Sequence, residues 1–202
     1  MPINIIIADD HSMIRKGIKL ILKTTFGYHN IIEVGSCVDL MSELRKKECT
    51  HLLLDIIFPD GTALEIIPNI INLFPDIKIM MFTMQSPVVY GDVFKQYGIH
   101  SYLPKSLNEE QTISHLRKFF NNEPILTSNE LLLPKNPFSS LSPRELEVLH
   151  YILNSHQTKT ISDFLNLRMS TISTLKKRIF EKTRTENLTQ LLELANLYDI
   201  NF

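Results

Sequence analysis

The stretch His51-Leu-Leu-Leu-Asp-Ile-Ile-Phe-Pro-Asp-Gly61 (HLLLDIIFPDG) runs three leucines directly into an aspartate and then into a turn. A short apolar run with a turn after it is typical of a buried strand. Similar runs, which we interpret as strands, occur at residues 4–8, 30–34, 52–54, 78–82 and 101–103. Asp55 therefore stands at the carboxyl end of the third expected strand, where a charge next to buried residues needs a reason.

Amphipathic segments alternate with these expected strands. Apolar residues recur at helical spacing in residues 13–22, 40–47, 63–74, 88–96 and 109–120. Pro68 lies inside the third of these segments, where we expect it to kink or interrupt the helix. Strict alternation of strands and helices predicts an α/β fold, a doubly wound five-stranded parallel sheet with helices on both faces.

The alternation ends at residue 121, and the pattern that follows is different. Residues 122–138 contain three prolines, which predicts a linker between a first domain at 1–121 and a second at 139–202. Ser142-Pro-Arg-Glu145 combines an N-cap serine, a proline at the first helical position and a glutamate at the capping-box position. Only helical patterns follow, so the second domain is expected to be all-α.

Composition excludes several classes of protein. Cys37 and Cys49 fit neither a metal-binding spacing nor a disulfide framework, which favours free thiols in a reducing compartment. The start MPINIIIADD lacks the basic segment and long apolar core of a secretory signal, and no uncharged window is long enough to cross a membrane. We therefore expect a cytoplasmic protein without a membrane partner.

Acidic residues end two of the expected strands, Asp9 and Asp10 the first and Asp55 the third. Open parallel sheets bind ligands at the carboxyl ends of their strands, and close carboxylates destabilise one another unless a cation lies among them. Hard oxygen ligands favour Mg²⁺, which readily accepts a phosphate oxygen. Thr83 and Lys105 follow two further strands and offer a hydroxyl and a cation. Each residue alone could be a cap, a turn residue or a solvated surface group, but together they favour phosphoryl chemistry.

A basic segment at residues 168–184 carries six cations against one acid, Glu181. Ile172, Leu175 and Ile179 form an inner apolar stripe, so that small polar residues and Lys177 face outward, as in a helix that enters the DNA major groove. A solvated charged face would explain this segment alone equally well. Expected helices at 143–154 and 160–166 precede it, and the three together predict a helix-turn-helix.

The segments IIIADDH, LLLDIIFPDG, MMFT and GIHSYLPKS resemble, in order and spacing, the receiver domain of two-component response regulators over nearly all of residues 3–120. The resemblance implies a flavodoxin-like fold in which a sensor histidine kinase phosphorylates Asp55, with Mg²⁺-dependent self-catalysis by the receiver. It also implies that Lys105 contacts the phosphoryl group and that Thr83 and Tyr102 are switch residues. The implied ligands of Mg²⁺ are Asp9, Asp10, Asp55 and the backbone carbonyl of Ile57.

The segments LSPRELEVLHYILN, TKTISDFLNL, STISTLKKRIFEKT and NLTQLLELA resemble the DNA-binding domain of LuxR/FixJ (NarL-type) regulators, most of all the branch that includes BvgA, EvgA and RcsB. The base contacts that this resemblance implies come from Ser173, Thr174 and Lys177. The implied phosphate contacts come from Lys159, Thr171, Lys176 and Arg178. The implied dimer helix is lined by Leu188, Leu191, Leu192 and Ala195. Arg168 departs from the family pattern, because it stands where a capping serine is common.

Both halves of the chain thus favour a DNA-binding transcriptional response regulator, a phosphoacceptor rather than an enzyme, with promoter DNA and a second copy of itself as partners. A phosphorylation-independent regulator with a vestigial receiver stays open. A hydrolase with an aspartate nucleophile is disfavoured because Ile57 stands where a second aspartate is expected. A dinucleotide enzyme is disfavoured because ADDHSM offers no glycine turn for a pyrophosphate.

Overall fold

The computed structural model describes residues 3–46, 48–85, 87–123, 136–198 and 200. The chain divides into two compact units. The described residues up to 84 and from 97 to 123 make up the first unit, and those from 85 to 96 and from 136 onward make up the second. Most of the linker expected at 122–138 lies outside the described residues, so the expected domain boundaries stay a prediction.

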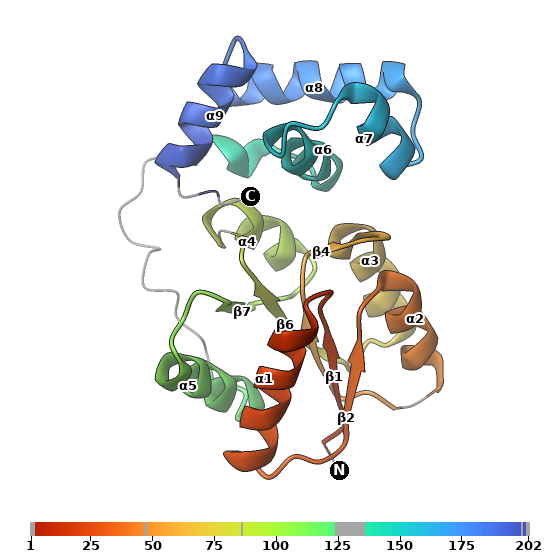
Figure 1. The fold of residues 1–202 in the computed structure, drawn as a ribbon, viewed down its shortest axis with the longest axis vertical. Coiled ribbons are helices and arrows are strands. Elements are labelled where there is room, and N and C mark those ends of the chain that lie inside the picture. Colours follow the sequence, from red (N-terminus) through yellow and green to blue (C-terminus); the bar gives the residue numbers. More distant parts are fainter. Residues whose placement is uncertain (1–2, 47, 86, 124–135, 199, 201–202) are drawn as a thin grey trace. The chain divides into compact units, whose positions relative to one another are not determined.

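A five-stranded sheet of parallel strands forms the centre of the first unit, as the sequence pattern predicts (Figure 1). The strands are β1 (Ile5–Ala8), β2 (Ile31–Val34), β3 (His51–Leu54), β6 (Lys78–Thr83) and β7 (Ser101–Pro104). Their order is β2-β1-β3-β6-β7. The order reverses direction between β1 and β3, and at such a switch point the loops at the carboxyl ends of the strands separate and leave a crevice.

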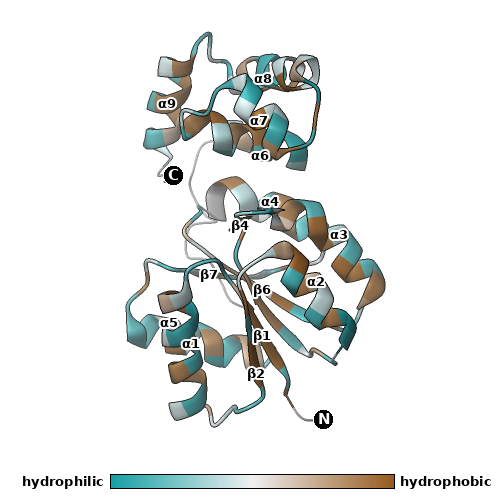
Figure 2. Cartoon of the chain, turned by 45° about the vertical axis from the view of Figure 1, so that its right-hand side comes forward, coloured by the Kyte–Doolittle hydropathy of each residue, from teal (hydrophilic) through white to brown (hydrophobic). Residues whose placement is uncertain are grey.

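Helices cover both faces of this sheet (Figure 1). Helices α1 (Ser12–Thr24) and α5 (Glu109–Phe120) lie on one face, and α2 (Cys37–Lys46) and α3 (Ala63–Leu73) lie on the other. Figure 2 shows the sheet as a mainly apolar layer with helices that are polar on their outer sides. The core under α1 and α5 consists of Ile5, Ile7, Ile18, Leu22, Leu53, Met80, Phe82, Leu103, Leu116 and Phe119.

Pro68 does not interrupt helix α3, so that half of the expectation is wrong, while the alternative of a kink stays a prediction. The helix runs from Ala63 to Leu73 with Pro68 inside it. Proline removes one backbone hydrogen bond, the one that would reach the carbonyl of Leu64. Leu64, Ile67 and Ile70 are buried, and their packing offsets that loss.

The turn after β3 contains a small hairpin that the sequence pattern did not predict, with strands β4 (Ile57–Phe58) and β5 (Gly61–Thr62). Asp60, at the tip of the hairpin, accepts hydrogen bonds from the backbone N–H groups of Cys37 and Val38, at 2.9 and 3.0 Å. These N–H groups belong to the first turn of α2, where helix donors have no partner within the helix. Asp60 therefore anchors the segment that follows Asp55 to a neighbouring helix.

The second unit is helical in its described part. Its elements are α4 (Pro87–Gln96), the 3₁₀ helix η1 (Pro137–Ser140), α6 (Pro143–Leu153), α7 (Thr158–Phe164), α8 (Met169–Thr183) and α9 (Leu188–Leu197). The capping box at the start of α6 is confirmed, because Ser142 and Glu145 bond each other's backbone N–H. Helices α7 and α8, joined by a short turn, contact each other and form the expected helix-turn-helix.

His51, the first residue of β3, is a buried neutral histidine, 5% exposed. Its ring contacts Phe119 and Phe120, with centroids 5.4 and 5.1 Å away. Its Nδ1 lies 2.8 Å from Thr50 Oγ1, and its buried Nε2 has no hydrogen-bond partner among the described residues. Burial, with a smaller contribution from Lys78, lowers the pKa of His51 to about 4.

We expect His51 to make the first unit sensitive to mild acid. Because the folded pKa lies below the unfolded value, the stability that depends on neutral His51 is complete above pH 6.5 and is lost as the pH falls towards 4. The loss attributable to His51 is about 2 to 3 kcal/mol at pH 4.5. Urea unfolding of the wild type and of His51→Gln, followed by circular dichroism between pH 7 and 4.5, measures it. Parallel pH curves for the two proteins would contradict the prediction.

Candidate functional site

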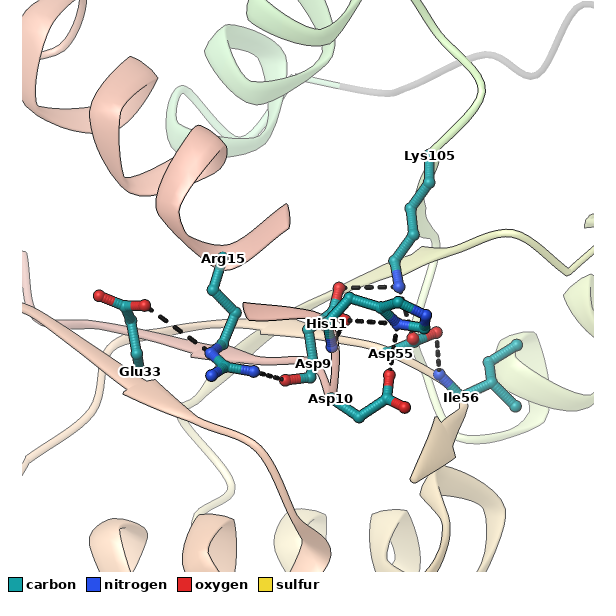
Figure 3. Close-up of polar contacts among 8 residues, drawn as sticks. All are labelled: Asp9, Asp10, His11, Arg15, Glu33, Asp55, Ile56 and Lys105. Carbon is teal, nitrogen blue, oxygen red and sulfur yellow. Dashed lines mark hydrogen bonds and ion pairs between the residues drawn. The ribbon is translucent and has the colours of Figure 1, made fainter. Parts of the chain in front are cut away.

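Three buried charged groups meet at the carboxyl edge of the sheet (Figure 3). Asp9 directly follows β1, Asp55 follows β3 and Lys105 follows β7. The Lys105 Nζ lies 2.7 Å from Asp9 Oδ2 and 2.5 Å from Asp55 Oδ2. Asp9 is 0% exposed and Asp55 5%. The lysine therefore supplies the positive charge that two neighbouring buried carboxylates require.

Backbone donors fix the remaining oxygens of these carboxylates. Asp9 Oδ1 accepts a hydrogen bond from the His11 N–H at 2.8 Å, and Asp55 Oδ1 accepts one from the Ile56 N–H at 2.7 Å (Figure 3). Asp10 is exposed, and its Oδ1 lies 2.6 Å from His11 Nδ1. The side chains are thus held in place before any ligand arrives.

This cluster has the composition and spacing of a metal site. Asp9, Asp10, His11 and Asp55 each offer one ligand atom, and these atoms lie within 4.8 Å of one another. Asp9 Oδ2 is buried and, apart from its ion pair with Lys105, makes no hydrogen bond to a described residue. Carboxylate oxygens are the ligands that Mg²⁺ prefers, so the residues fit the expected cation. The Ile57 carbonyl, two residues after Asp55, stays a predicted ligand.

Burial raises the pKa of Asp55 above its ordinary value. The positive charge and hydrogen bond of Lys105 and a hydrogen bond from Thr83 oppose this effect, whereas the charge of Asp9 adds to it. Asp55 is therefore a carboxylate whose charge depends on its cationic neighbour.

The two expected switch residues are both buried near this edge. Thr83 is the last residue of β6, and its hydroxyl bonds to Asp55. Tyr102 lies in β7 and is buried as well. The structure thus brings Thr83 to Asp55, while the part that Tyr102 plays stays a prediction.

Helix α8 presents the expected outward face. Thr171, Ser173, Thr174, Lys177 and Arg178 are exposed, as is Lys159 on α7. The hydroxyls of Ser173 and Thr174 donate to the carbonyls of Met169 and Ser170, at 3.0 and 2.9 Å. Arg168 occupies the N-cap position and makes no side-chain capping bond, as its lack of a side-chain oxygen predicts.

Two cations of the basic helix have structural contacts that its sequence pattern did not reveal. Lys182 Nζ lies 2.6 Å from Glu145 Oε2 and donates to the Ser140 carbonyl at 3.0 Å. Lys176 is partly buried and lies 6.0 Å from the centre of the Phe180 ring. No sequence signal marked the Lys182 contact, because the burial of Glu145, which makes a cationic partner necessary, is known only from the structure.

The expected dimer helix α9 requires a correction. Leu191 and Ala195 are buried inside their own unit, each 0% exposed. Helical periodicity identifies an apolar face, but it does not tell whether that face packs inside the domain or against a partner. Leu188 and Leu192 are more accessible and stay predicted dimer residues, and Leu197, which the sequence reading omitted, is exposed.

Family models match both halves of the chain. The model of the response regulator receiver domain matches residues 5–117, which is more than half of the chain. The chain belongs to the response regulator family. The model of bacterial regulatory proteins of the luxR family matches residues 139–195. The expected family, with a receiver and a LuxR-type DNA-binding domain, is therefore confirmed, and the chain is a two-component transcription regulator rather than a conventional enzyme.

Known proteins resemble this response regulator over its whole length. Response regulator UvrY of Escherichia coli K12 is 27% identical, over 96% of this chain and 93% of that protein. Response regulator GacA of Pseudomonas aeruginosa is 28% identical, over 96% and 94%. A structure of RcsB from Salmonella enterica serovar Typhimurium, bound to promoter P1flhDC with the phosphomimetic BeF3-, covers 98% of this chain and 100% of its own, at 26% identity and a TM-score of 0.79.

Among the helices of the described residues, none combines the length and the apolar character that crossing a membrane requires.

Removal of the Lys105 cation is expected to destabilise the first unit. Lys105→Met leaves two buried carboxylates side by side, which costs about 3 kcal/mol at pH 7. The cost should shrink towards pH 5, because Asp55, whose pKa burial already raises, then takes up a proton. Urea unfolding at both pH values measures the effect. Lys78→Met, at the exposed start of β6, is the matched control, and equal stability of the two variants at pH 7 would contradict this prediction.

Proposed function

We propose that phosphorylation of Asp55 by a sensor histidine kinase switches this response regulator between two states that differ in dimerisation and promoter binding. The observation that carries the proposal is the position of the Lys105 Nζ between Asp9 and Asp55, at 2.7 and 2.5 Å. A phosphoryl group on Asp55 adds about 1.5 to 2 negative charges at neutral pH. It would be added next to the Lys105 ammonium group and next to the three carboxylates, of Asp9, Asp10 and Asp55, that would hold Mg²⁺.

Each residue of the site has a defined task in the proposed transfer. A carboxylate oxygen of Asp55 attacks the phosphorus of the donor and forms an acyl phosphate as the donor group leaves. Asp9, Asp10, Asp55 and the Ile57 carbonyl would hold Mg²⁺, which neutralises the negative charge of the transferring group. Lys105 would exchange a carboxylate partner for a phosphoryl oxygen. The receiver thus contributes to its own modification while the kinase supplies the phosphoryl group.

The proposed output of this chemistry is a conformational switch. The Thr83 hydroxyl, which bonds Asp55 before modification, would move to a phosphoryl oxygen, and Tyr102 would turn towards the space that Thr83 leaves. Phosphorylation shifts the equilibrium only by the difference in its interactions with the two states.

The proposed DNA contacts lie on the exposed face of helix α8 and the start of α7. Ser173, Thr174 and Lys177 would contact base edges, and Lys159, Thr171, Lys176 and Arg178 would contact phosphates. The proposed homodimer uses Leu188 and Leu192 of α9. A structure of two RcsB dimers bound to two parallel DNAs, 26% identical with a TM-score of 0.59, supports a DNA-bound dimer by analogy. The free thiols of Cys37 and Cys49 are consistent with a cytoplasmic location.

The proposal is tested with the full chain, Mg²⁺ and a small acyl phosphate donor. We expect phosphorylation to promote dimers, measured by light scattering, and to tighten binding to a selected promoter fragment at least tenfold. Asp55→Asn has nearly the same shape but no nucleophilic carboxylate, so it should show neither effect. Equal DNA binding by wild type and Asp55→Asn, with and without donor, would favour the alternative of a regulator with a vestigial receiver.

Lys177→Ala is expected to weaken specific DNA binding and to reduce its salt dependence. The Lys177 side chain is 79% exposed, and its contact with Glu181, at 3.8 Å, is a weak surface pair. A cation that enters the groove also neutralises phosphate charge, so if Lys177 does this beside its proposed base contact, its loss lowers the slope of log K against log salt by about 1. Fluorescence anisotropy between 50 and 200 mM salt measures this slope.

Lys182→Ala is the matched control for Lys177→Ala, because it removes the same charge from the same helix. Lys182 is bound to Glu145 and Ser140, so its loss should lower thermal stability and leave the salt slope unchanged. An unchanged slope in Lys177→Ala would show that Lys177 neutralises no phosphate charge and would leave only its proposed base contact. A lowered slope in Lys182→Ala would show that Lys182 also neutralises phosphate charge, contrary to the prediction.

A further inference from the structure

We infer that Arg15 is a positioning residue of the acidic site, which fixes the backbone of Asp9 and thereby sets the affinity of the site for Mg²⁺. The inference rests on the metal site proposed above and goes beyond it, since Arg15 offers no metal ligand. Arg15 lies in the first turns of α1, on the side of Asp9 that faces strand β2 (Figure 3). Its side chain is 17% exposed.

The first observation is a direct contact between Arg15 and the main chain of Asp9. Arg15 Nη1 donates a hydrogen bond to the Asp9 carbonyl at 2.5 Å. The ladder between β1 and β2 ends at the pair Ala8 and Val34, and the Asp9 N–H donates to the Val34 carbonyl at 3.1 Å. The Asp9 carbonyl thus lies beyond the last residue pair of the β1–β2 ladder. The Arg15 guanidinium donates the hydrogen bond that a neighbouring strand would donate within the ladder.

The second observation is that Arg15 is itself held in position. Glu33, in β2, places Oε2 3.7 Å from Arg15 Nε, an ion pair without a hydrogen bond, and Oε1 2.5 Å from Lys19 Nζ. The carboxylate therefore pairs with two cations of α1, Arg15 and Lys19, and Figure 3 shows its contact with Arg15. A guanidinium that is mostly buried and ion-paired through Nε with a carboxylate has a better-defined position as a hydrogen-bond donor than a solvated guanidinium.

Both ends of Asp9 are fixed as a result. Its main chain is held by Arg15, and its carboxylate by the His11 N–H and Lys105. Mg²⁺ demands near-ideal octahedral geometry, so a small shift of the Asp9 backbone would misplace a buried ligand oxygen. Partners that orient metal ligands change metal affinity about 10- to 100-fold when they are removed.

A competing effect of Arg15 has the opposite sign, because a positive charge near the site repels Mg²⁺. The Glu33 carboxylate lies next to Arg15 Nε, and its negative charge offsets much of the positive charge of the guanidinium. The hydrogen bond to the Asp9 carbonyl acts at 2.5 Å and is not screened by water. We therefore expect the positioning effect to exceed the repulsion.

The test is the dissociation constant of Mg²⁺ alone for the full chain, measured by isothermal titration calorimetry. Arg15→Met keeps the aliphatic bulk and removes the donor, and it should raise the dissociation constant about tenfold. Lys19→Met is the matched control, because Lys19 shares Glu33 and does not touch Asp9; it should change the constant less than twofold. Arg15→Lys keeps the charge and one donor and should recover part of the affinity.

A kinetic split distinguishes positioning from general damage to the fold. At saturating Mg²⁺ the maximal phosphorylation rate of Arg15→Met should stay within twofold of wild type, because Arg15 touches none of the reacting atoms. The Mg²⁺ concentration for half-maximal rate should rise in parallel with the dissociation constant. A large loss of maximal rate with unchanged Mg²⁺ affinity would overturn the inference.

The remaining outcomes separate this inference from the proposed function. An equal or tighter dissociation constant in Arg15→Met overturns the positioning role alone. Equal weakening in Lys19→Met and Arg15→Met assigns the effect to charge rather than to the Asp9 contact, and also overturns it. A wild type that binds no Mg²⁺ overturns the metal site and the inference together. If Arg15→Met does not fold, Arg15→Lys decides, since unchanged affinity there contradicts the need for the guanidinium.

Discussion

The repulsion between two buried carboxylates, Asp9 and Asp55, is the constraint on which the rest of the receiver depends. Two buried carboxylates side by side require a nearby positive charge, and the Lys105 side chain supplies it from a distant strand. Strand β7 is separated from β3 by β6, so the lysine side chain extends across the edge of β6, with its Nζ 5.6 Å from the centre of the Phe82 ring. The strand order and the length of one side chain together make the acidic edge stable.

The same arrangement explains why this edge is suited to a reversible charge. In the unmodified protein Lys105 contacts both Asp9 and Asp55, and Thr83 bonds to Asp55. A phosphoryl group on Asp55 would therefore have its partners already in place. Pre-positioned groups reduce the reorganisation that accompanies a change of charge. The stability of the unmodified receiver depends in return on the protonation of Asp55 and on the presence of Lys105.

Much of this site follows from the sequence, because strand ends are readable from short apolar runs followed by polar residues. This pattern predicts that Asp9, Asp55, Thr83 and Lys105 lie at one edge of the sheet. The capping box before the first helix of the second domain and the apolar stripe of the basic helix predict the helix-turn-helix. The contacts of Arg15, Asp60 and Lys182 were not predictable, since each joins elements that are distant along the chain. Leu191 and Ala195 illustrate a different limit, because periodicity gives an apolar face without giving its partner.

The contact of Lys182 with Glu145 has a consequence for how such a protein can acquire new target genes. It joins the end of α8, the proposed recognition helix, to the start of α6, so this contact, which lies outside the proposed DNA-contact residues, helps to set the angle of that helix. Ser173, Thr174 and Lys177 can then be exchanged without disturbing the scaffold that presents them. If the proposed DNA contacts hold, promoter choice and domain stability depend on separate residues of one helix, and the first can change while the second is kept.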